Sequence, residues 1–356
     1  MAKVLMKGNE AIGEAAIKAG CLNYFAYPIT PQSEVAEYLA KRLPEVNGTF
    51  VQGESEVAVG YMIFGAAGCG QRVMTTSSSP GISLMSEALS YIAGARCPAV
   101  FVNIMRGGPG LGGILPSQGD YFQATKGGGH GDYHLLVMAP EGVQEAVEMT
   151  MKAFPLAEKY RGPVMILGDG LIGQMMEPVE FTDDLYEEPL NNDEWATSGM
   201  DRRGSDKRNI VKSLFLDPKE LNDNNLTLKA QYERMKKEDV MFEAYNTNTD
   251  YKVLIVSYGT MSRVCRTAID TMKEQGLEIG MIRPKTLFPF PEEQIHDAAA
   301  KESCKAVISI ELSMGQMVED VQRCVRGIKP VEWYGECGGD IPAPETIADV
   351  VQSLLN

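Results

Sequence analysis

Short apolar runs alternate with longer segments of helical periodicity over roughly the first 180 residues of the chain. This alternation is typical of βαβ units, in which helices cover a sheet of parallel strands. The run Pro98–Met105 is almost continuously apolar, which favours a strand buried on both faces. The predicted strands are Tyr24–Ile29, Thr49–Gln52, Arg72–Ser77, Ala99–Met105, Leu135–Ala139 and Val164–Leu167. The predicted helices are Asn9–Ala19, Pro31–Leu43, Ser55–Ala67, Pro80–Ala93, Gln118–Thr125 and Val143–Lys159.

The alternation stops near residue 180 and restarts at residue 251. We therefore predict an α/β domain over residues 1–180, a charged connector over residues 181–250 with a helix at Leu228–Phe242, and a smaller α/β domain over residues 251–356. The strands predicted in this last part are Lys252–Ser257, Glu278–Ile282, Ala306–Ile310 and Val331–Tyr334. The helices predicted there are Ser262–Gln275, Glu292–Lys301, Met314–Val325 and Pro344–Leu355.

Composition and charge narrow the class of protein. A chain of 356 residues with 44% hydrophobic and 23% charged residues is ordinary for a soluble globular protein of two domains. The formal net charge of −15 argues against nucleic acid and anionic membranes as partners, since both require clustered Lys and Arg. No segment has the length and apolar content of a signal peptide or a bilayer span, and the seven cysteines never form a C-x-x-C pair. We therefore expect a cytoplasmic protein with no metal site of its own.

Polar residues end four of the predicted strands, and the ends of parallel strands meet at the edge where α/β folds bind ligands. Glu54 and Glu56 follow the strand Thr49–Gln52 and are predicted in the first turn of the next helix. Carboxylates there could simply complement the helix dipole. Glu56 starts the apolar run of the helix, so it is the better candidate for contact with a ligand. The other three polar strand ends are Tyr27–Thr30, Thr75–Ser79 and Asn103–Arg106.

Arg106 ends an otherwise apolar strand and enters a glycine-rich loop. A guanidinium in that position can bind a carboxylate through two hydrogen bonds, or it can form a salt bridge with Glu54 or Glu56. Thr30 can cap a helix that begins at Pro31, and it can contact a ligand as well.

Three further patterns give weaker candidates for sites. The glycines at positions 108, 110 and 113 match a dinucleotide fingerprint, but Pro109 interrupts the turn that such a site needs. Asp169 at a strand end, together with Asn191–Asn192, offers a set of ligands for Mg²⁺ and a diphosphate, although no clear helix and strand lie between them. His130 could face the site, but a hydrogen bond within its loop is the simpler expectation.

These residues together resemble the α-type chain of the 2-oxoacid:ferredoxin oxidoreductases. Among the subfamilies, Ser77–Gly81 and Gly108–Gly113 look most like the branched-chain type, which acts on 3-methyl-2-oxobutanoate (2-oxoisovalerate). The motifs that carry the resemblance are Gly8–Ala11, Tyr27–Pro31, Gly53–Glu56, Ser77–Ile82, Met105–Gly110, Pro116–Asp120, Gly129–Asp132 and Arg283–Pro289.

The resemblance implies a pyrimidine-binding domain of a thiamine-diphosphate enzyme, followed by a transketolase-C-terminal-like domain. It places Glu56 on N1′ of the aminopyrimidine of the cofactor, where a carboxylate favours the imino tautomer that can take the proton from the thiazolium carbon. It implies that Pro28, Ile29, Thr30 and Ser79 line the cofactor. Arg106 and Thr30 then lie on the substrate side, with Arg106 on the carboxylate of the 2-oxoacid.

The same resemblance divides the enzyme among several chains. It places the diphosphate and Mg²⁺ on a partner subunit and the iron–sulfur clusters on others, with CoA as the acyl acceptor, so this chain should be inactive alone. Three alternatives remain open at this point. They are a subunit that acts on 2-oxoglutarate, a non-oxidative thiamine-dependent decarboxylase or transketolase-like chain, and a non-catalytic assembly subunit.

Overall fold

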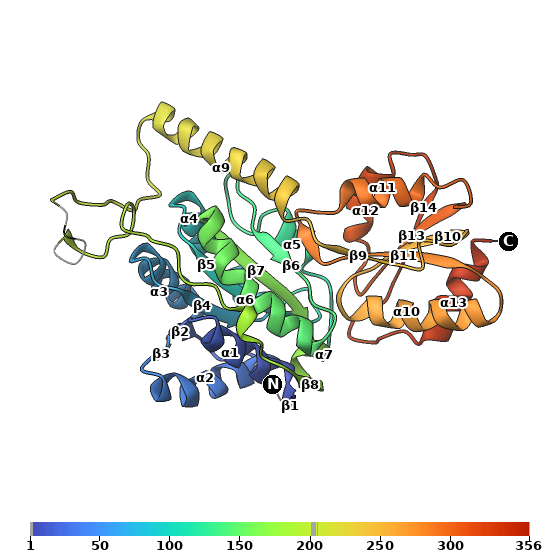
Figure 1. Ribbon diagram of the computed structural model, residues 1–356, viewed down its shortest axis with the longest axis horizontal. Coiled ribbons are helices and arrows are strands. Elements are labelled where there is room, and N and C mark those ends of the chain that lie inside the picture. Colours follow the sequence, from blue (N-terminus) through green and yellow to red (C-terminus); the bar gives the residue numbers. More distant parts are fainter. Residues whose placement is uncertain (1–2, 201–203, 205, 356) are drawn as a thin grey trace.

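The computed structural model describes residues 3–200, 204 and 206–355, which form two α/β parts, each built around its own sheet (Figure 1). Buried apolar residues form two clusters. One runs through the first part and continues between the second sheet and the helices on one of its faces, and the other lies between the second sheet and the helices on its opposite face. Within the described residues, no helix combines the length and the apolar character needed to cross a membrane.

The first part contains a seven-stranded sheet in the order β12-β6-β7-β5-β4-β2-β3. Its strands are parallel except β12, which runs antiparallel to β6. The residues of β4, β5 and β7 are buried throughout, and for β5 this confirms the prediction from the apolar run Pro98–Met105. The strands are β2 (Asn23–Ala26), β3 (Thr49–Gln52), β4 (Val73–Ser77), β5 (Ala99–Met105), β6 (Leu136–Met138), β7 (Pro163–Asp169) and β12 (Thr286–Phe288).

The six helices predicted for this part are present, and α7 and the two-stranded sheet of β1 and β8 were not predicted. The prediction that a helix begins at Pro31 under a Thr30 cap is wrong, because α2 begins at Ser33 and its cap position is Gln32. The helices are α1 (Gly8–Lys18), α2 (Ser33–Glu45), α3 (Glu56–Gly68), α4 (Ser79–Gly94), α5 (Tyr121–Thr125), α6 (Val143–Tyr160) and α7 (Gly170–Gln174). The two short strands are β1 (Val4–Lys7) and β8 (Met176–Val179).

The segment predicted as a connector contains a short 3₁₀ helix, η1 (Asp183–Leu185), and one long helix, α9 (Pro218–Glu238), which lies along the first part (Figure 1). The helix predicted at Leu228–Phe242 is therefore wrong at both ends. Its true start has a clear local cause, since the Asp217 carboxylate accepts a hydrogen bond from the backbone of Lys219 at 2.9 Å. Residues 201–203 and 205 of the predicted connector lie outside the described residues.

The second part contains a five-stranded sheet in the order β14-β13-β10-β11-β9. Its four predicted strands run parallel, and β9 pairs antiparallel with β11 although it lies in the range predicted as connector. The strands are β9 (Phe242–Tyr245), β10 (Val253–Val256), β11 (Ile279–Pro284), β13 (Ala306–Glu311) and β14 (Val331–Gly335). The helices are α10 (Gly259–Glu274) and α13 (Pro344–Ser353) on one face, and α11 (Glu292–Ala299) and α12 (Met317–Val325) on the other (Figure 1).

The two parts are joined by more than the chain itself. The strand β12 comes from the second part of the sequence but completes the sheet of the first. Gln118 hydrogen-bonds across the boundary with its side chain and its backbone, to Tyr258 O at 2.8 Å and to the backbone of Leu312 at 2.8 and 2.9 Å. These contacts hold the second part against the same edge of the first sheet at which β5 and β7 end.

Candidate active site

Glu56 is the first residue of α3, directly after the end of β3 and a short turn. Ser55 caps this helix, and its hydroxyl accepts a hydrogen bond from the backbone of Ala58 at 3.2 Å. Glu56 is buried, with 7% of its surface exposed, whereas Glu54 is exposed and lies before the helix. The prediction that both carboxylates lie in the first helical turn is therefore wrong for Glu54, and the structure separates the two as the apolar pattern indicated.

The carboxylate of Glu56 lies against the start of α4. A Cβ atom placed on Gly81 would come within 2.9 Å of Glu56 Oε1 and within 2.1 Å of Ser77 Oγ, so a larger residue there would force these side chains to move. Within the residues that the structure describes, this carboxylate has no hydrogen-bond or ion-pair partner. A largely buried carboxylate that no group of the chain has engaged is free to accept a hydrogen bond from a ligand or another chain.

Unpaired hydroxyl groups lie at the end of β4, beside Glu56. Ser77 Oγ and Ser78 Oγ are buried and form no hydrogen bond, and the same holds for Thr75 Oγ1 further down the strand. Most buried polar atoms in proteins have a partner, so a cluster of unpaired ones marks a place where a polar ligand can bind. Ser77 and Ser78 belong to a motif that the sequence singled out, but their lack of partners is visible only in the structure.

Arg106 follows β5, and its side chain is buried at the same edge of the sheet. It donates hydrogen bonds to the carbonyl oxygens of Thr30 at 2.9 Å and Leu111 at 3.2 Å. The alternative of a salt bridge to Glu54 or Glu56 is not realised in the described part of the chain. Nε of Arg106 is buried without a partner, so its positive charge remains available to an anion.

Ser79 is held in a network of buried polar groups. Its hydroxyl donates to Asp120 Oδ2 at 2.6 Å and accepts from the backbone N–H of Arg106 at 3.0 Å. Asn103 Nδ2 also donates to Asp120 Oδ2, at 2.8 Å, and Asn103 Oδ1 accepts from the Ser79 backbone at 3.0 Å. Burial raises the pKa of Asp120, while these two donors lower it. The hydroxyl of Ser79 is thus already committed to fixing the end of β5.

The residues Pro28, Ile29 and Thr30 form the turn between β2 and α2. Pro28 and Thr30 are exposed and Ile29 is half-buried, so all three have surface that a ligand can contact. The carbonyl of Thr30 points at Arg106, which ties this turn to the end of β5. The structure therefore brings together Glu56, Ser79, Arg106 and the turn at residues 28–30, all at one edge of the first sheet.

Asp120 and Gly81 are parts of the candidate site that were not predicted from the sequence. Asp120 follows no strand and lies in the motif Pro116–Asp120, so its motif was the available signal. The role of Gly81 depends on the close approach of α3 and α4, which the sequence does not show.

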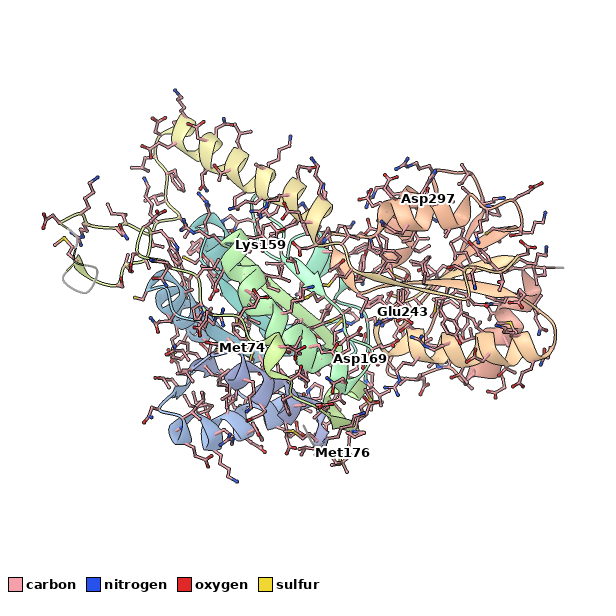
Figure 2. All side chains as sticks on the ribbon, in the orientation of Figure 1. Met74, Lys159, Asp169, Met176, Glu243 and Asp297 are labelled. Atoms are coloured by element: carbon pink, nitrogen blue, oxygen red, sulfur yellow. The ribbon has the colours of Figure 1, made fainter. Side chains whose placement is uncertain are left out.

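The alternative of a Mg²⁺ and diphosphate site in this chain is not supported. Asp169 is buried at the end of β7, where Oδ1 caps α7 by accepting from the backbones of Leu171 at 3.0 Å and Ile172 at 3.2 Å. Asn192 instead donates to the carbonyl of Gly70, which precedes β4, at 2.6 Å. Figure 2 shows Asp169 on the side of the first sheet nearest the second part. The two halves of that candidate therefore lie at opposite edges of the sheet.

The hydrogen bond of His130 is not made within its loop, as was expected, but to α4: its backbone carbonyl accepts from Ser90 Oγ at 2.6 Å. Its ring lies edge-on to Tyr91, also in α4, with 6.1 Å between the ring centres. His134 stacks on Phe288 of β12 at 4.2 Å, and burial lowers its pKa. Both histidines thus have structural roles.

Comparison with known proteins gives matches over almost the whole chain. Residues 14–250 match the family described as pyruvate flavodoxin/ferredoxin oxidoreductase, thiamine diphosphate-binding, and residues 252–347 match pyruvate:ferredoxin oxidoreductase core domain II. The chain is 46% identical over 341 residues to the ketoisovalerate oxidoreductase subunit VorB of Methanothermobacter thermautotrophicus, covering 96% of this chain and 95% of that one. It is 36% identical over 374 residues to the 2-oxoglutarate synthase subunit KorA of the same organism, covering 98% of each.

Two solved structures resemble the fold. The 2-oxoglutarate:ferredoxin oxidoreductase from Magnetococcus marinus, with 2-oxoglutarate, coenzyme A and succinyl-CoA bound, has a TM-score of 0.85 at 29% identity, and this chain spans 66% of that longer one. A split-gene transketolase, described as an inactive beta4 tetramer, has a TM-score of 0.57 at 15% identity over 98% of each chain. This likeness supports the fold and nothing further. The match to the Magnetococcus enzyme covers 100% of the present chain and therefore includes both of its parts.

Proposed function

The chain belongs to the pyruvate flavodoxin/ferredoxin oxidoreductase family, and we propose that it is the subunit that holds the aminopyrimidine end of thiamine diphosphate in such an enzyme. It is a subunit of a ferredoxin-dependent 2-oxoacid oxidoreductase, which forms an acyl-CoA by oxidative decarboxylation. The proposed substrate is 3-methyl-2-oxobutanoate, because the relatives named for ketoisovalerate reach 46% identity and those named for 2-oxoglutarate reach 36%. The likeness to the Magnetococcus enzyme keeps 2-oxoglutarate as the second candidate.

The observation that carries this proposal is the buried Glu56 carboxylate, which lacks a partner within the described residues. An N–H group of a bound pyrimidine supplies the donor that this carboxylate needs. The unpaired hydroxyls of Ser77 and Ser78, and the close approach of Ser77 and Glu56 that Gly81 permits, support a polar ligand at this end of β4. The residues present therefore match the cofactor that the family binds.

When bound, thiamine diphosphate supplies the nucleophilic carbon and the electron sink that decarboxylation of a 2-oxoacid requires. Glu56 accepts a hydrogen bond from N1′ and so biases the position of the proton on the aminopyrimidine. Arg106, whose guanidinium has no carboxylate partner among the described residues, binds the carboxylate of the 2-oxoacid. Thr30 holds Arg106 in place through its carbonyl and lines the cofactor together with Pro28 and Ile29.

The other components of the enzyme belong to partner chains in this proposal: the diphosphate and Mg²⁺ to one subunit and the iron–sulfur clusters to others. Asp169 is used to cap α7, and burial raises its pKa. Burial also raises the pKa of the thiols of Cys21, Cys97 and Cys265, which disfavours the thiolate form that ligates a cluster. Free cysteines and an acidic surface fit a reducing cytoplasm, where we place the complex.

The test is reconstitution of the complex with the Glu56→Gln variant and the matched control Glu54→Gln. Turnover of 3-methyl-2-oxobutanoate, followed by ferredoxin reduction, should fall by about 10²–10⁴ for Glu56→Gln, because proton transfer loses its carboxylate. Glu54→Gln changes an exposed carboxylate two positions away and should leave turnover close to that of the wild type. Full turnover by the Glu56→Gln complex would remove Glu56 from the mechanism.

The same reconstitution separates the two remaining alternatives. Glu56 lines none of the five cavities of about 290–470 Å³ found among the described residues, an observation that favours an assembly subunit. An assembly subunit predicts that Glu56→Gln and Arg106→Ala complexes form and work normally. A non-oxidative decarboxylase predicts release of the aldehyde without reduction of ferredoxin.

A further inference from the structure

Two adjoining cavities lie at the edge of the first sheet opposite to Glu56, where β4 and β5 begin. One has a volume of about 350 Å³ and the other about 400 Å³, and both are lined by Arg161, Glu194 and Trp195. Lys159, which lines the first cavity, lies shortly before the start of β7, and Asp169 is the last residue of β7. Figure 2 labels both residues and shows that they lie apart. Together the cavities have the size of a small-molecule site.

Two arginines in this region have no counter-ion. Arg96 and Arg161 both line the second cavity, and Nε of each is buried without a hydrogen bond. Neither forms an ion pair with any residue that the structure describes, although the chain has 48 acidic residues. Burial, together with the positive charge of Arg96, lowers the pKa of Arg161 to about 10.

The position of these arginines after a helix does not explain their lack of partners. Arg96 and Arg161 have the left-handed φ angles of 56° and 45° that are common just after helix ends, and Arg326 after α12 has nearly the same φ of 54°. Arg326, however, pairs with Glu293 at 3.3 Å. Arg326, which follows its helix as Arg161 does, is therefore an exposed comparison residue with a paired charge.

We propose that Arg96 and Arg161 form a binding site for the phosphate group of a small molecule. Guanidinium groups bind phosphate through paired N–H donors, and here they come from two separate loops and line the same hollow. The guanidinium of Arg161 lies 4.3 Å from the centre of the Trp195 ring, which supports one face of the group and leaves its N–H edges free. Arg208 and Lys212 also line this cavity and add positive charge around it.

The first cavity can accommodate the remainder of such a ligand. Its lining includes the apolar side chains of Val100, Phe154 and Ala157 and the polar groups of Gln71 and Asn191. Apolar walls with a few polar groups are typical of sites for flat organic molecules. The ligand class assigned here is therefore either inorganic phosphate or a phosphorylated compound with a planar body, such as a nucleoside monophosphate.

Occupation of this site would act on the connector. Trp195 belongs to the segment between β8 and α9, whereas Arg96 and Arg161 belong to the first part. Asn209 of the same segment donates to the carbonyls of Asp193 at 2.8 Å and Ala196 at 3.0 Å. A bound phosphate would tie this folded-back segment to the sheet without contact with Glu56 or Arg106.

Trp195 provides a direct reporter for the test. The chain contains two tryptophans, so the Trp333→Phe variant leaves Trp195 as the single source of tryptophan fluorescence. In this background the full chain is titrated with inorganic phosphate, and separately with AMP, at constant ionic strength. We expect saturable quenching, and we expect Arg96→Gln or Arg161→Gln to raise the dissociation constant at least about tenfold. Arg326→Gln should leave the dissociation constant unchanged.

The two titrations distinguish the sources of phosphate. Tighter binding of AMP than of phosphate shows that the adjoining cavity holds the ligand body, and equal affinity identifies phosphate itself as the ligand. Because substitution of a buried arginine can also disturb folding, the thermal midpoint of each variant is measured with and without phosphate. The wild type should gain stability from phosphate, and a folded Arg96→Gln variant should not.

Three results would overturn this proposal. One is the absence of saturable quenching by either compound, and another is a dissociation constant that the two arginine variants do not change. The third is that these variants leave phosphate binding intact but weaken assembly with the partner subunits, which would assign the arginines to a carboxylate of a partner chain.

Discussion

Glu56 and Arg106 lie at one edge of the same sheet and carry opposite charges, yet they do not neutralise each other. Arg106 is held by the carbonyl oxygens of Thr30 and Leu111, which fix its position without cancelling its charge. A charge oriented by neutral dipoles remains available to a ligand of the opposite sign. Under the proposed function, this arrangement keeps an anion for the cofactor and a cation for the substrate within one chain.

Substitution of Arg106 should chiefly affect the binding of substrate. In the assembled complex, we expect Arg106→Ala to raise the KM for the 2-oxoacid by about 10–10³-fold, because a charge-assisted contact to its carboxylate is lost. Arg106→Lys should recover part of the loss, since it keeps the charge but not the paired N–H geometry. Steady-state kinetics with varied 2-oxoacid provides the measurement. Unchanged KM in both variants would show that Arg106 serves only to hold the turn at Thr30.

A methyl group added at position 81 should impair the site, whereas one added at a nearby helical glycine should not. Gly81→Ala would push against Ser77 Oγ and Glu56 Oε1, at 2.1 and 2.9 Å, so we expect weaker binding of thiamine diphosphate in the reconstituted complex. Gly65→Ala in α3 is the control, because no atom lies within 4 Å of the added carbon. That variant should be neutral or gain up to about 1 kcal/mol from helix propensity. Equal cofactor affinity in the two variants would contradict this account of the site.

At the level of single residues, the sequence predicted the position of some residues of the candidate site and missed that of others. Glu56 and Arg106 were predicted because both follow apolar strands, and the end of a parallel strand is a place that periodicity locates well. Asp120 lies in a loop, and its burial depends on Ser79 and Asn103, which approach it from other segments. No local pattern shows which loop folds over a strand end, so this part of the site required the structure.

At the level of elements, the missed strands are those whose partners lie far away in the sequence. The strand β12 has three residues, and it is a strand because it pairs with β6, some 150 residues earlier. By contrast, the start of α9 could have been predicted from the sequence, although we placed it at Leu228. Asp217 and Pro218 are a favourable cap and first residue for a helix. Length and periodicity predict helices and strands that have a clear apolar face. An edge strand such as β12 forms because a neighbouring strand pairs with it, and its own sequence does not show this.

The role of β12 leads to a prediction about stability. Leu287 is 1% exposed, so Leu287→Ala should lower the free energy of unfolding by about 2–5 kcal/mol. Because β12 belongs to the first sheet, the loss should appear in the unfolding of the first part, measured by amide hydrogen exchange in β6. Leu216→Ala removes a side chain that is 86% exposed and should change stability by less than about 0.5 kcal/mol. Exchange faster only in the second sheet would contradict the assignment of β12.

At the level of the whole molecule, the two parts are joined by a buried group of charges. Arg283 of β11 is 1% exposed and donates to both oxygens of Glu145 in α6, at 2.7 and 2.9 Å. It also donates to Glu243 of β9 at 3.0 Å. Lys285 adds a second cation, 2.5 Å from Glu145. A guanidinium buried at this depth is stable because carboxylates from both parts surround it.

This group of charges should make the contact between the two parts sensitive to acid. Burial alone would raise the pKa of Glu145, but the hydrogen bonds and charge of Arg283 lower it from 4.5 to about 2. A carboxyl whose pKa is lowered by folding contributes its full stability above its unfolded pKa of about 4.3, and loses it as the pH falls towards 2. The shift corresponds to a contribution on the order of 3 kcal/mol.

The prediction is tested by comparison with Glu145→Gln, which is neutral at every pH. Urea unfolding of the full chain at pH 7 should show the variant less stable by about 3–5 kcal/mol, because the charge of Arg283 loses its main partner. As the pH falls from 5 to 3, the unfolded wild-type chain takes up a proton at Glu145 while the folded chain stays ionised. The wild type therefore loses stability relative to the variant, and the difference in unfolding free energy should narrow. The exposed Glu54→Gln substitution serves as the matched control. A difference that stays constant from pH 7 to pH 3 would show that Glu145 holds the two parts together by its shape and hydrogen bonds, and not by its charge.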